Sequence, residues 1–342
     1  MSTPANPRAS ALPAASSGAP LLTELAPFAL LAQRALGREP VGIEPLAGDV
    51  GRRRYFRLRF ADGATALGVF YPAEELDARR RWLAAREILE RAVRVPDVLA
   101  DDGEGRQIVE DFGNVDLAGR FADAPDEREP RLGHAVAAAA AIAAVLDPAV
   151  NPPFDFALFR RELDLAREAV FDLWLGEPLS RDDRAAHDRF ADSLCQEILD
   201  HPRALCHRDF HGNNLFPLET EVAAIDFQDL RVGPDAYDLA SLLWERTTLA
   251  WMRPPLADAA VAEFASRRGI DPRALAARLD RVLLQRAWKV CGTFARAVAA
   301  GRGEAYRRYL PGEIALVGRL LSDSPRDSPF RGVFERRLAP LC

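Results

Sequence analysis

The sequence predicts an α+β protein with two lobes, a small N-terminal lobe rich in antiparallel strands and a larger helical C-terminal lobe. Two alternating or β-branched apolar segments near the start are joined by a turn, as in a hairpin. From about residue 131 onward apolar residues instead recur at helical spacing, with a single interruption near 204–230. We expect a disordered tail of small residues and prolines at 1–20, the first lobe at 21–112 and the second at 113–342.

The first lobe shows a change of period along the chain. Asp62 and Gly63 lie between two strand-like segments and favour a tight hairpin turn. The predicted elements, in order, are a helix at about 21–36, strands at 55–60 and 64–71, a charged helix at about 74–92, and two short strands within RVPDVLADDGEGRQIVEDFG.

The second lobe is helical except at its one interruption. There the apolar segments NNLFPL and EVAAIDF flank a turn at Glu219 and Thr220, which predicts a second hairpin. The helices expected after it lie at about 236–251, 256–268, 271–299 and 303–322.

Composition excludes several classes of protein. With 45 Lys and Arg against 51 Asp and Glu in 342 residues, the net charge of −6 gives no global field that would attract nucleic acid. No apolar run reaches the roughly 18 residues that a membrane span needs. The four cysteines form no CxxC pair, which argues against a zinc ribbon and a disulfide framework. We expect a cytoplasmic monomer without nucleic-acid or membrane partners.

One polar cluster, LCHRDFHGNNLF at 205–216, immediately precedes the second predicted hairpin. It has the form H-R-D-x-x-x-x-N, in which Asn214 follows Asp209 by five residues, and Asp226 ends the apolar segment twelve residues later. Phosphoryl transfer from ATP needs a carboxylate beside the attacking hydroxyl, and hard oxygen ligands for Mg²⁺. These three side chains predict a kinase site.

Other interpretations of the same residues exist. His207 and His211 have the i, i+4 spacing of a zinc pair on a helix, but Gly212 and the two asparagines after it argue against a helix. His207 then serves to hold the loop by hydrogen bonds, and His211 is either structural or close to the substrate. An Asp at a strand end commonly forms a turn, so Asp226 could have this purely structural role instead.

The motifs HRDFHGNN, IDFQD and GPDAYDLASLL resemble those of the aminoglycoside phosphotransferase family, over about residues 21–322. RRYFRL, VEDFG and IDFQD are most similar to the bacterial anomeric kinases for N-acetylmuramate and N-acetylglucosamine, which serve cell-wall recycling. The resemblance implies a protein-kinase-like fold that uses ATP and Mg²⁺.

The resemblance also implies roles for individual residues. Asp209 would be the catalytic base, and Asn214 and Asp226 the magnesium ligands. Asp238 would support the catalytic loop, although a carboxylate facing a helix N-terminus explains it equally well. Backbone groups of a hinge at 109–113, which includes Glu110 and Phe112, would bind adenine.

The chain departs from the kinase pattern at the nucleotide phosphates. The strand that normally carries a phosphate-binding lysine reads ALGVFY, and the single lysine of the chain, Lys289, lies far along the second lobe. The segment AGDVGRRRYFR (47–57) has Gly48 and Gly51 but no GxGxxG. Because arginine binds phosphate through two hydrogen bonds, we expect Arg54 or Arg57 to replace the lysine. The alternative is that these arginines are merely solvated at the tip of a basic hairpin. The anomeric sugar kinases that the chain resembles also lack this lysine.

The acceptor is less defined than the reaction. Gln228 and Asp229 offer one amide and one carboxylate to a neutral sugar. N-acetylmuramate also carries a lactyl carboxylate, which an arginine such as Arg231 or Arg246 would bind. We expect a kinase for the anomeric hydroxyl of N-acetylmuramate or N-acetylglucosamine. The alternatives are a kinase for another small hydroxyl compound, such as an aminoglycoside, choline or homoserine, and a nucleotide-binding pseudokinase that acts as a regulator.

Overall fold

The computed structural model describes residues 19–46, 52–301, 303–322, 324 and 327–341. The chain divides into two compact units, the first made of residues up to Arg79 together with Pro96–Asp111. The second contains Arg80–Val95 and the chain from Phe112 onward, so the division falls inside the segment 109–113 that we expected as a hinge. Residues 80–95, expected in the first lobe, belong to the second unit.

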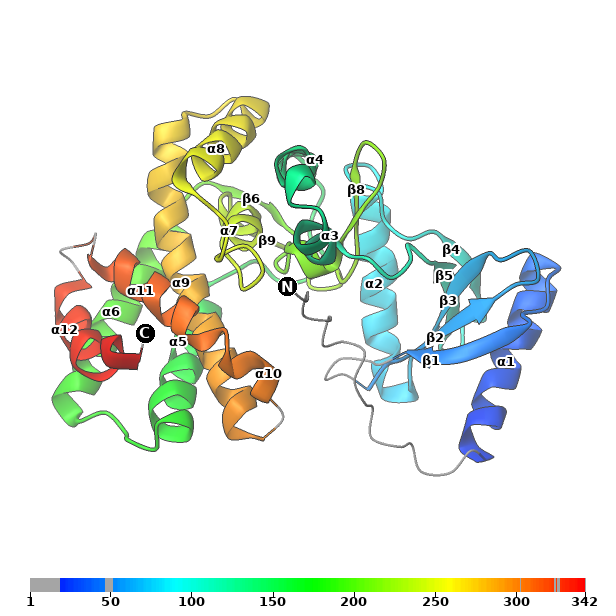
Figure 1. Cartoon of the computed structure of the whole chain (residues 1–342), viewed down its shortest axis with the longest axis horizontal. Coiled ribbons are helices and arrows are strands. Elements are labelled where there is room, and N and C mark those ends of the chain that lie inside the picture. Colours follow the sequence, from blue (N-terminus) through cyan, green and yellow to red (C-terminus); the bar gives the residue numbers. More distant parts are fainter. Residues whose placement is uncertain (1–18, 47–51, 302, 323, 325–326, 342) are drawn as a thin grey trace, which may run out of the picture. The chain divides into compact units, whose positions relative to one another are not determined.

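The first unit is built on a five-stranded antiparallel sheet with strand order β1-β2-β3-β5-β4 (Figure 1). The predicted hairpin is confirmed: β2 pairs with β3, and Gly63 adopts φ +84° in the turn between them. The sequence did not indicate β1, whose residues GIEPL include Glu44 and Pro45 and do not alternate. The strands are β1 (Gly42–Leu46), β2 (Arg54–Arg59), β3 (Thr65–Phe70), β4 (Val98–Asp101) and β5 (Arg106–Glu110).

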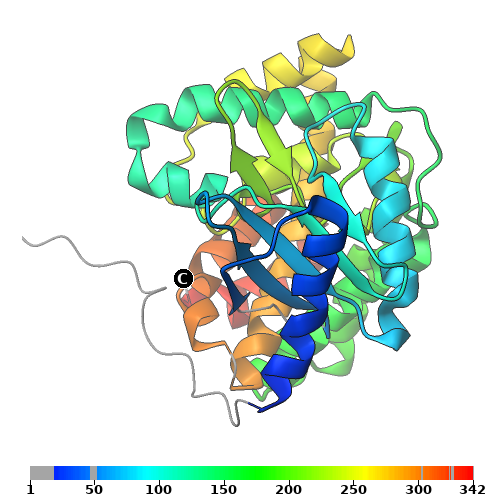
Figure 2. The same cartoon turned by 90° about the vertical axis from the view of Figure 1, so that its right-hand side faces the viewer.

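Helix α1 (Ala19–Leu36) lies along one face of this sheet (Figure 1 and Figure 2). It begins at Ala19, two residues inside the expected tail. Phe28 and Ala32 of the helix pack with Phe56 and Leu58 of β2 in one buried cluster. The close packing of α1 on the sheet requires Gly68 on β3, because a Cβ there would lie 2.9 Å from the Phe28 ring. Helix α2 (Leu76–Leu89) follows the sheet hairpin and ends three residues before its predicted end.

The second unit is helical and is organised around α9 (Pro272–Ala299), against which most of its other long helices pack. Helix α12 had no counterpart in the sequence-based prediction, and the helix predicted at 303–322 is divided into α10 and α11. The other helices are α3 (Leu117–Asp123), α4 (Arg128–Ala143), α5 (Phe156–Arg167), α6 (Arg181–Leu199), α7 (Tyr237–Leu243), α8 (Pro254–Arg268), α10 (Glu304–Arg307), α11 (Leu310–Ser322) and α12 (Ser328–Arg337). Among the described residues, no helix combines the length and the apolar character that crossing a membrane requires.

Two short antiparallel strand pairs interrupt the helices of the second unit. The predicted hairpin is confirmed as β7 (Leu215–Pro217) paired with β8 (Val222–Ala224). The other pair, β6 (Arg203–Cys206) with β9 (Arg231–Pro234), was not predicted, because its strands are four residues long and 24 residues intervene between them. The helix predicted at 236–251 ends at Leu243, and turns follow it.

Helices α5 and α9 approach each other closely at Gly292. A Cβ at Gly292 would lie 2.3 Å from the Cα of Ala166 on α5, nearer than any real contact. We expect Gly292→Ala to lower the free energy of unfolding by about 2 kcal/mol. The added Cβ would clash with the backbone of α5, and the clash can be relieved only by moving one helix away from the other. Urea unfolding measures the change.

Gly133 on α4 is the matched control, since a Cβ added there meets no atom within 4 Å. Gly133→Ala removes a helical glycine without overpacking, so it should raise the stability by about 0.5–1 kcal/mol. Equal changes in both variants would contradict the close approach of α5 and α9.

Candidate active site

The loop at 207–214 connects β6 to β7 and is fixed by a buried carboxylate on α7. Both oxygens of Asp238 accept backbone hydrogen bonds, from His207 N at 2.6 Å and from Arg208 N at 2.9 Å. Arg208 adopts φ +84°, an unfavourable conformation for a side chain with a Cβ, so these bonds stabilise a strained turn. Of the two interpretations of Asp238, the structure agrees with the one in which it supports the loop.

Asp209 and Asn214 are joined by hydrogen bonds within this loop. Asn214 donates its side-chain amide to the backbone oxygen of Asp209 at 2.9 Å, and the backbone N of His211 donates to the same oxygen at 3.1 Å. Because the Asn214 nitrogen is used in this way, its side-chain oxygen is left as an acceptor. The Asp209 carboxylate is partly exposed.

The β7–β8 hairpin brings Asp226 beside Asn214. Leu215 pairs with Ala224, and the next residue, Ile225, donates its backbone N to Asn214 O at 3.0 Å. Asp226 follows directly with φ +64°, a second left-handed position in a residue other than glycine. Backbone strain of this kind concentrates at functional sites. The predicted constellation of Asp209, Asn214 and Asp226 is therefore assembled around one hairpin.

His207 is a structural residue in this loop. Its side chain is buried, Nε2 donates to Ile225 O at 2.9 Å, and its ring packs edge-on against Phe210. The bond ties the loop to the hairpin segment that carries Asp226. Within the described residues, neither His207 nor His211 belongs to a cluster of three potential metal ligands.

Lys289, the single lysine, lies beside the catalytic loop and was missed by sequence reasoning. Its Nζ is 3.2 Å from the Glu162 carboxylate of α5, which also accepts from Arg208 Nη2 at 3.0 Å and from Gln285 Nε2 at 2.9 Å. Burial lowers the pKa of Lys289, but neighbouring groups, Glu162 and Asp209 among them, raise it above its ordinary value. The ammonium therefore stays charged.

This cluster sets the protonation of Asp209. Burial raises the pKa of the Asp209 carboxyl, but the charges of Lys289 and Arg286 outweigh burial and bring the pKa down to about 2. Arg286 also donates to Arg208 O at 3.0 Å. It therefore lowers the pKa of Asp209 and also holds the backbone of the loop in place. Asp209 is consequently ionised at neutral pH.

Lys289→Met should shift the pH profile of the enzyme. With its strongest charge partner removed, the pKa of Asp209 rises, so the acid limb of kcat/KM moves upward by about 1 pH unit. We predict that Asp209 acts in its ionised form, so activity should be lost as the pH falls through that pKa. Rates measured down to the lowest pH at which both proteins stay folded give the shift.

Lys289→Arg is the matched variant, because it retains the charge. We expect its acid limb to remain near that of the wild type. An unchanged acid limb in Lys289→Met would show that the lysine does not act on Asp209.

Two of the predicted substrate residues, Gln228 and Asp229, are engaged with other residues of the site. Gln228 donates to Asp226 Oδ1 at 2.7 Å, and its own side-chain oxygen is buried without a partner. Asp229 lies 3.3 Å from Arg208 Nη1. The structure thus joins the segment after β8 to the catalytic loop through an ion pair that the sequence did not indicate.

Three of the predicted nucleotide-binding residues, Arg54, Arg57 and Glu110, belong to the first unit. Arg57 on β2 forms a bidentate, largely buried pair with Asp111, at 2.6 and 3.0 Å. The exposed Arg54 guanidinium stacks on the Phe70 ring at 4.7 Å, and Glu110 ends β5. The glycine positions at 48 and 51 lie outside the described residues.

Phe112 lies within the expected hinge, and the second unit resumes at this residue. Its ring packs on Phe216 of β7 at 5.9 Å, and the Arg94 guanidinium lies 5.7 Å from the same ring. Residue 112 is therefore anchored to the hairpin that carries the candidate magnesium ligands.

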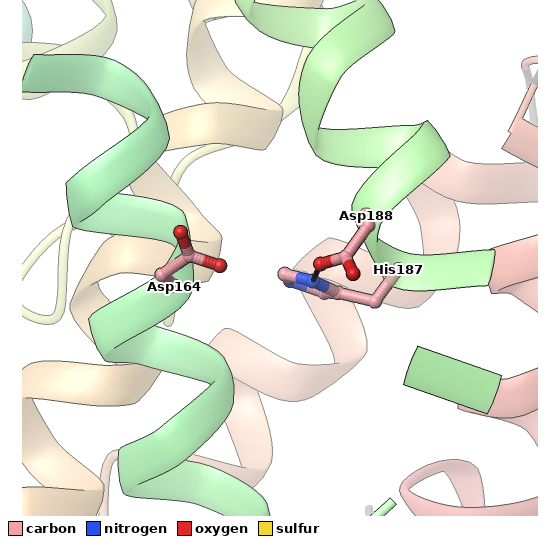
Figure 3. Close-up of side chains that lie close together, drawn as sticks. All are labelled: Asp164, His187 and Asp188. Atoms are coloured by element: carbon pink, nitrogen blue, oxygen red, sulfur yellow. Dashed lines mark ion pairs between the residues drawn. The ribbon is translucent and has the colours of Figure 1, made fainter. Parts of the chain in front are cut away.

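A second polar cluster, away from the catalytic loop, has the composition of a metal site. Asp164 of α5 and His187 and Asp188 of α6 lie together (Figure 3). Arg160 already pairs with Asp164, and also with Asp188 at 2.8 Å. Burial lowers the pKa of His187 to about 3, and its Nε2 accepts from Trp288 at 3.2 Å. His187 Nδ1 is buried without a hydrogen-bond partner, but the Arg160 guanidinium lies between the two carboxylates, so the ion pairs of this cluster join α5 to α6.

A five-stranded antiparallel unit followed by a helical unit with this loop and hairpin defines a kinase-like phosphotransferase. The chain belongs to the phosphotransferase enzyme family, whose model matches residues 42–278. This confirms the predicted family and the predicted class of enzyme.

Individual relatives and structures agree with this assignment. The chain is 30% identical over 310 residues to the N-acetylmuramate/N-acetylglucosamine kinase of Pseudomonas aeruginosa, with 84% of this chain and 90% of the relative covered. It is 28% identical to the protein of the same name from Neisseria meningitidis serogroup B, with 78% and 81% covered. An amicoumacin kinase solved with AMP-PNP and Ca²⁺ shares the fold, with a TM-score of 0.59, 15% identity, and 89% and 94% coverage.

Proposed function

We propose that the protein is an ATP- and Mg²⁺-dependent kinase for the anomeric hydroxyl of N-acetylmuramate and N-acetylglucosamine. The observation that carries the proposal is the assembly of Asp209, Asn214 and Asp226 around one loop and hairpin. The sugar kinases of Pseudomonas and Neisseria support the acceptor, since each aligns with more than three quarters of this chain.

In the proposed reaction Asp209 orients the acceptor hydroxyl and takes its proton. The sugar oxygen forms a bond to the γ-phosphorus of ATP while the bond from that phosphorus to the β–γ bridging oxygen breaks, which releases ADP. A carboxylate with a pKa of about 2 is a weak base, so its main contribution is to position the hydroxyl and accept the proton late.

Asn214 and Asp226 fit Mg²⁺ by their chemistry. Both offer hard oxygens, the Asn214 oxygen is left as an acceptor once its nitrogen binds Asp209 O, and Asp226 is exposed. Bound there, Mg²⁺ would neutralise charge on the β- and γ-phosphate oxygens. Gln228 would hold the Asp226 carboxylate in place for this role.

For the nucleotide we propose that Arg54 or Arg57 takes the place of the strand lysine, and that backbone groups around Glu110 and Phe112 bind adenine. The pairing of Arg57 with Asp111 supports a positioning role, because a bidentate partner fixes the guanidinium. Arg54 is the more exposed of the two. We propose His211, Gln228 and Asp229 as contacts of the acceptor. We also propose that the protein is a monomer and that it acts in the cytoplasm, which supplies ATP.

An acceptor panel tests the function. ADP release should be measured with ATP, Mg²⁺ and, in turn, N-acetylmuramate, N-acetylglucosamine, the methyl glycoside of N-acetylglucosamine, kanamycin and choline. We expect release with the two free sugars and none with the glycoside, whose anomeric oxygen is blocked. Release with kanamycin or choline alone would reject the sugar and favour the alternative acceptor. No release with any acceptor would favour the pseudokinase.

A further inference from the structure

The two sugars of the proposed function differ in one charged group. N-acetylmuramate carries a lactyl ether on C3, which ends in a carboxylate that is ionised at neutral pH, whereas N-acetylglucosamine has a hydroxyl there. An enzyme that favours the first sugar needs a cation placed near the bound ring. Arginine suits this task because its planar guanidinium binds a carboxylate through two parallel hydrogen bonds.

Arg246 meets the geometric requirement because it is attached to the catalytic loop itself. Its Nη2 donates to the side-chain oxygen of Asn213 at 2.6 Å. Asn213 in turn donates to Asp116, the N-cap of α3, at 3.0 Å. Asn213 is next to the candidate magnesium ligand Asn214, so this chain of bonds places a guanidinium beside the reaction site.

The segment that carries Arg246 is held in place before any ligand binds. Thr248 is fully buried, receives the backbone N of Glu245 at 3.0 Å and donates to Leu243 O at 2.8 Å. Trp251 donates to Thr247 O at 2.9 Å and packs edge-on against Phe121 of α3. A preorganised arginine loses less freedom on binding, which strengthens its contact with a ligand.

Arg246 forms no ion pair with another described residue. Within the described part of the chain, no carboxylate lies within ion-pair distance of it, and the Asn213 bond uses one of its five N–H donors. The buried acids Glu245 and Glu313 interact electrostatically with Arg246. Burial raises their pKa values to about 7 and about 8, so at neutral pH neither carries a full negative charge.

Two other cations at the loop are already paired with carboxylates. Arg208 and Lys289 share Glu162, and Arg208 also pairs with Asp229. Arg231 donates to Pro152 O at 2.8 Å and its guanidinium lies 5.9 Å from the centre of the Phe154 ring. Of the two arginines that the sequence offered for a carboxylate, Arg231 and Arg246, the second is the one bonded to a side chain of the catalytic loop, that of Asn213.

We infer that Arg246 binds the lactyl carboxylate of N-acetylmuramate and thereby makes this sugar the preferred acceptor. The inference rests on the proposed function. It gives His211 a defined place, because its half-buried ring lies within the electrostatic influence of both Arg246 and Asp209. The acceptor ring would then lie across His211, with its C1 hydroxyl toward Asp209 and its C3 substituent toward Arg246.

The test compares the two sugars in one enzyme. In Arg246→Gln we expect the ratio of kcat/KM for N-acetylmuramate to that for N-acetylglucosamine to fall about 10²-fold, mainly through KM, because a carboxylate would lose its bidentate partner. Arg246→Lys should recover part of the ratio. Arg253→Gln is the matched control, since Arg253 is an exposed arginine of the same segment that bonds backbone oxygens, and it should leave the ratio unchanged.

The outcomes separate the inference from the function. If both sugars lose rate equally in Arg246→Gln, the arginine acts on the loop through Asn213 and the inference is wrong. A wild-type enzyme that phosphorylates neither sugar overturns the proposed function and the inference with it. The methyl ester of N-acetylmuramate adds a check that needs no variant, because the wild type should treat this uncharged sugar about as poorly as Arg246→Gln treats the acid.

Discussion

Asp209→Asn should lower kcat for both sugars by about 10²–10⁴-fold, the range in which positioned acid–base groups contribute. The amide keeps the size of the side chain but cannot accept the hydroxyl proton. It also removes the negative charge that interacts with Lys289 and Arg286, which weakens the electrostatic stabilisation of both cations. ADP release at saturating sugar and ATP measures the loss.

Asp147→Asn serves as the control for this variant. Asp147 forms a surface pair with Arg91 at 3.3 Å, so its loss should leave kcat unchanged and the melting temperature within about 2 °C. If Asp209→Asn kept more than a tenth of the wild-type rate, another group would have to receive the proton.

Asp238→Asn should damage both folding and catalysis. Both carboxylate oxygens accept backbone N–H groups at the start of the catalytic loop, and an amide can satisfy only one of them. Because the other N–H is left buried and unpaired, we expect the free energy of unfolding to fall by about 2–3 kcal/mol. We also expect kcat to fall at least about tenfold, since Arg208 would no longer be held at φ +84°. Urea unfolding and ADP release give the two values.

Asp235→Asn separates stability from catalysis. Asp235 is also buried and forms a bidentate pair with Arg278, at 3.0 and 2.7 Å, but it does not contact the loop. It should lose a comparable amount of stability while kcat is retained. Equal losses of kcat in Asp235→Asn and Asp238→Asn would assign the effect of Asp238 to general destabilisation.

The parts of the site that the sequence predicted are those assembled by local structure. Asp209 and Asn214 lie in one short loop, and Asp226 comes next to them through a hairpin whose turn and apolar arms are visible in the sequence. The first hairpin of the sheet could be predicted for the same reason. In each case the partners are separated by a tight turn, so spacing alone determines their proximity.

The parts that the sequence could not predict depend on packing between distant segments. Glu162 and Gln285 are 123 residues apart and meet because α5 and α9 cross at Gly292, one turn from Lys289. A lysine in the middle of a helix carries no local signal of such a neighbour. The pairing of Arg57 with Asp111, 54 residues apart, depends in the same way on the order of strands in the sheet.

The central claim is phosphoryl transfer to an anomeric hydroxyl with Asp209 as the proton acceptor, and phosphorus NMR tests it most directly. Wild-type protein and Asp209→Asn are each incubated with ATP, Mg²⁺ and N-acetylmuramate. The account predicts a new phosphate signal, split by the anomeric proton of the sugar, that grows with ADP in the wild type and is absent in the variant. A phosphate signal split by protons of another sugar carbon, or one of equal intensity in Asp209→Asn, would contradict it.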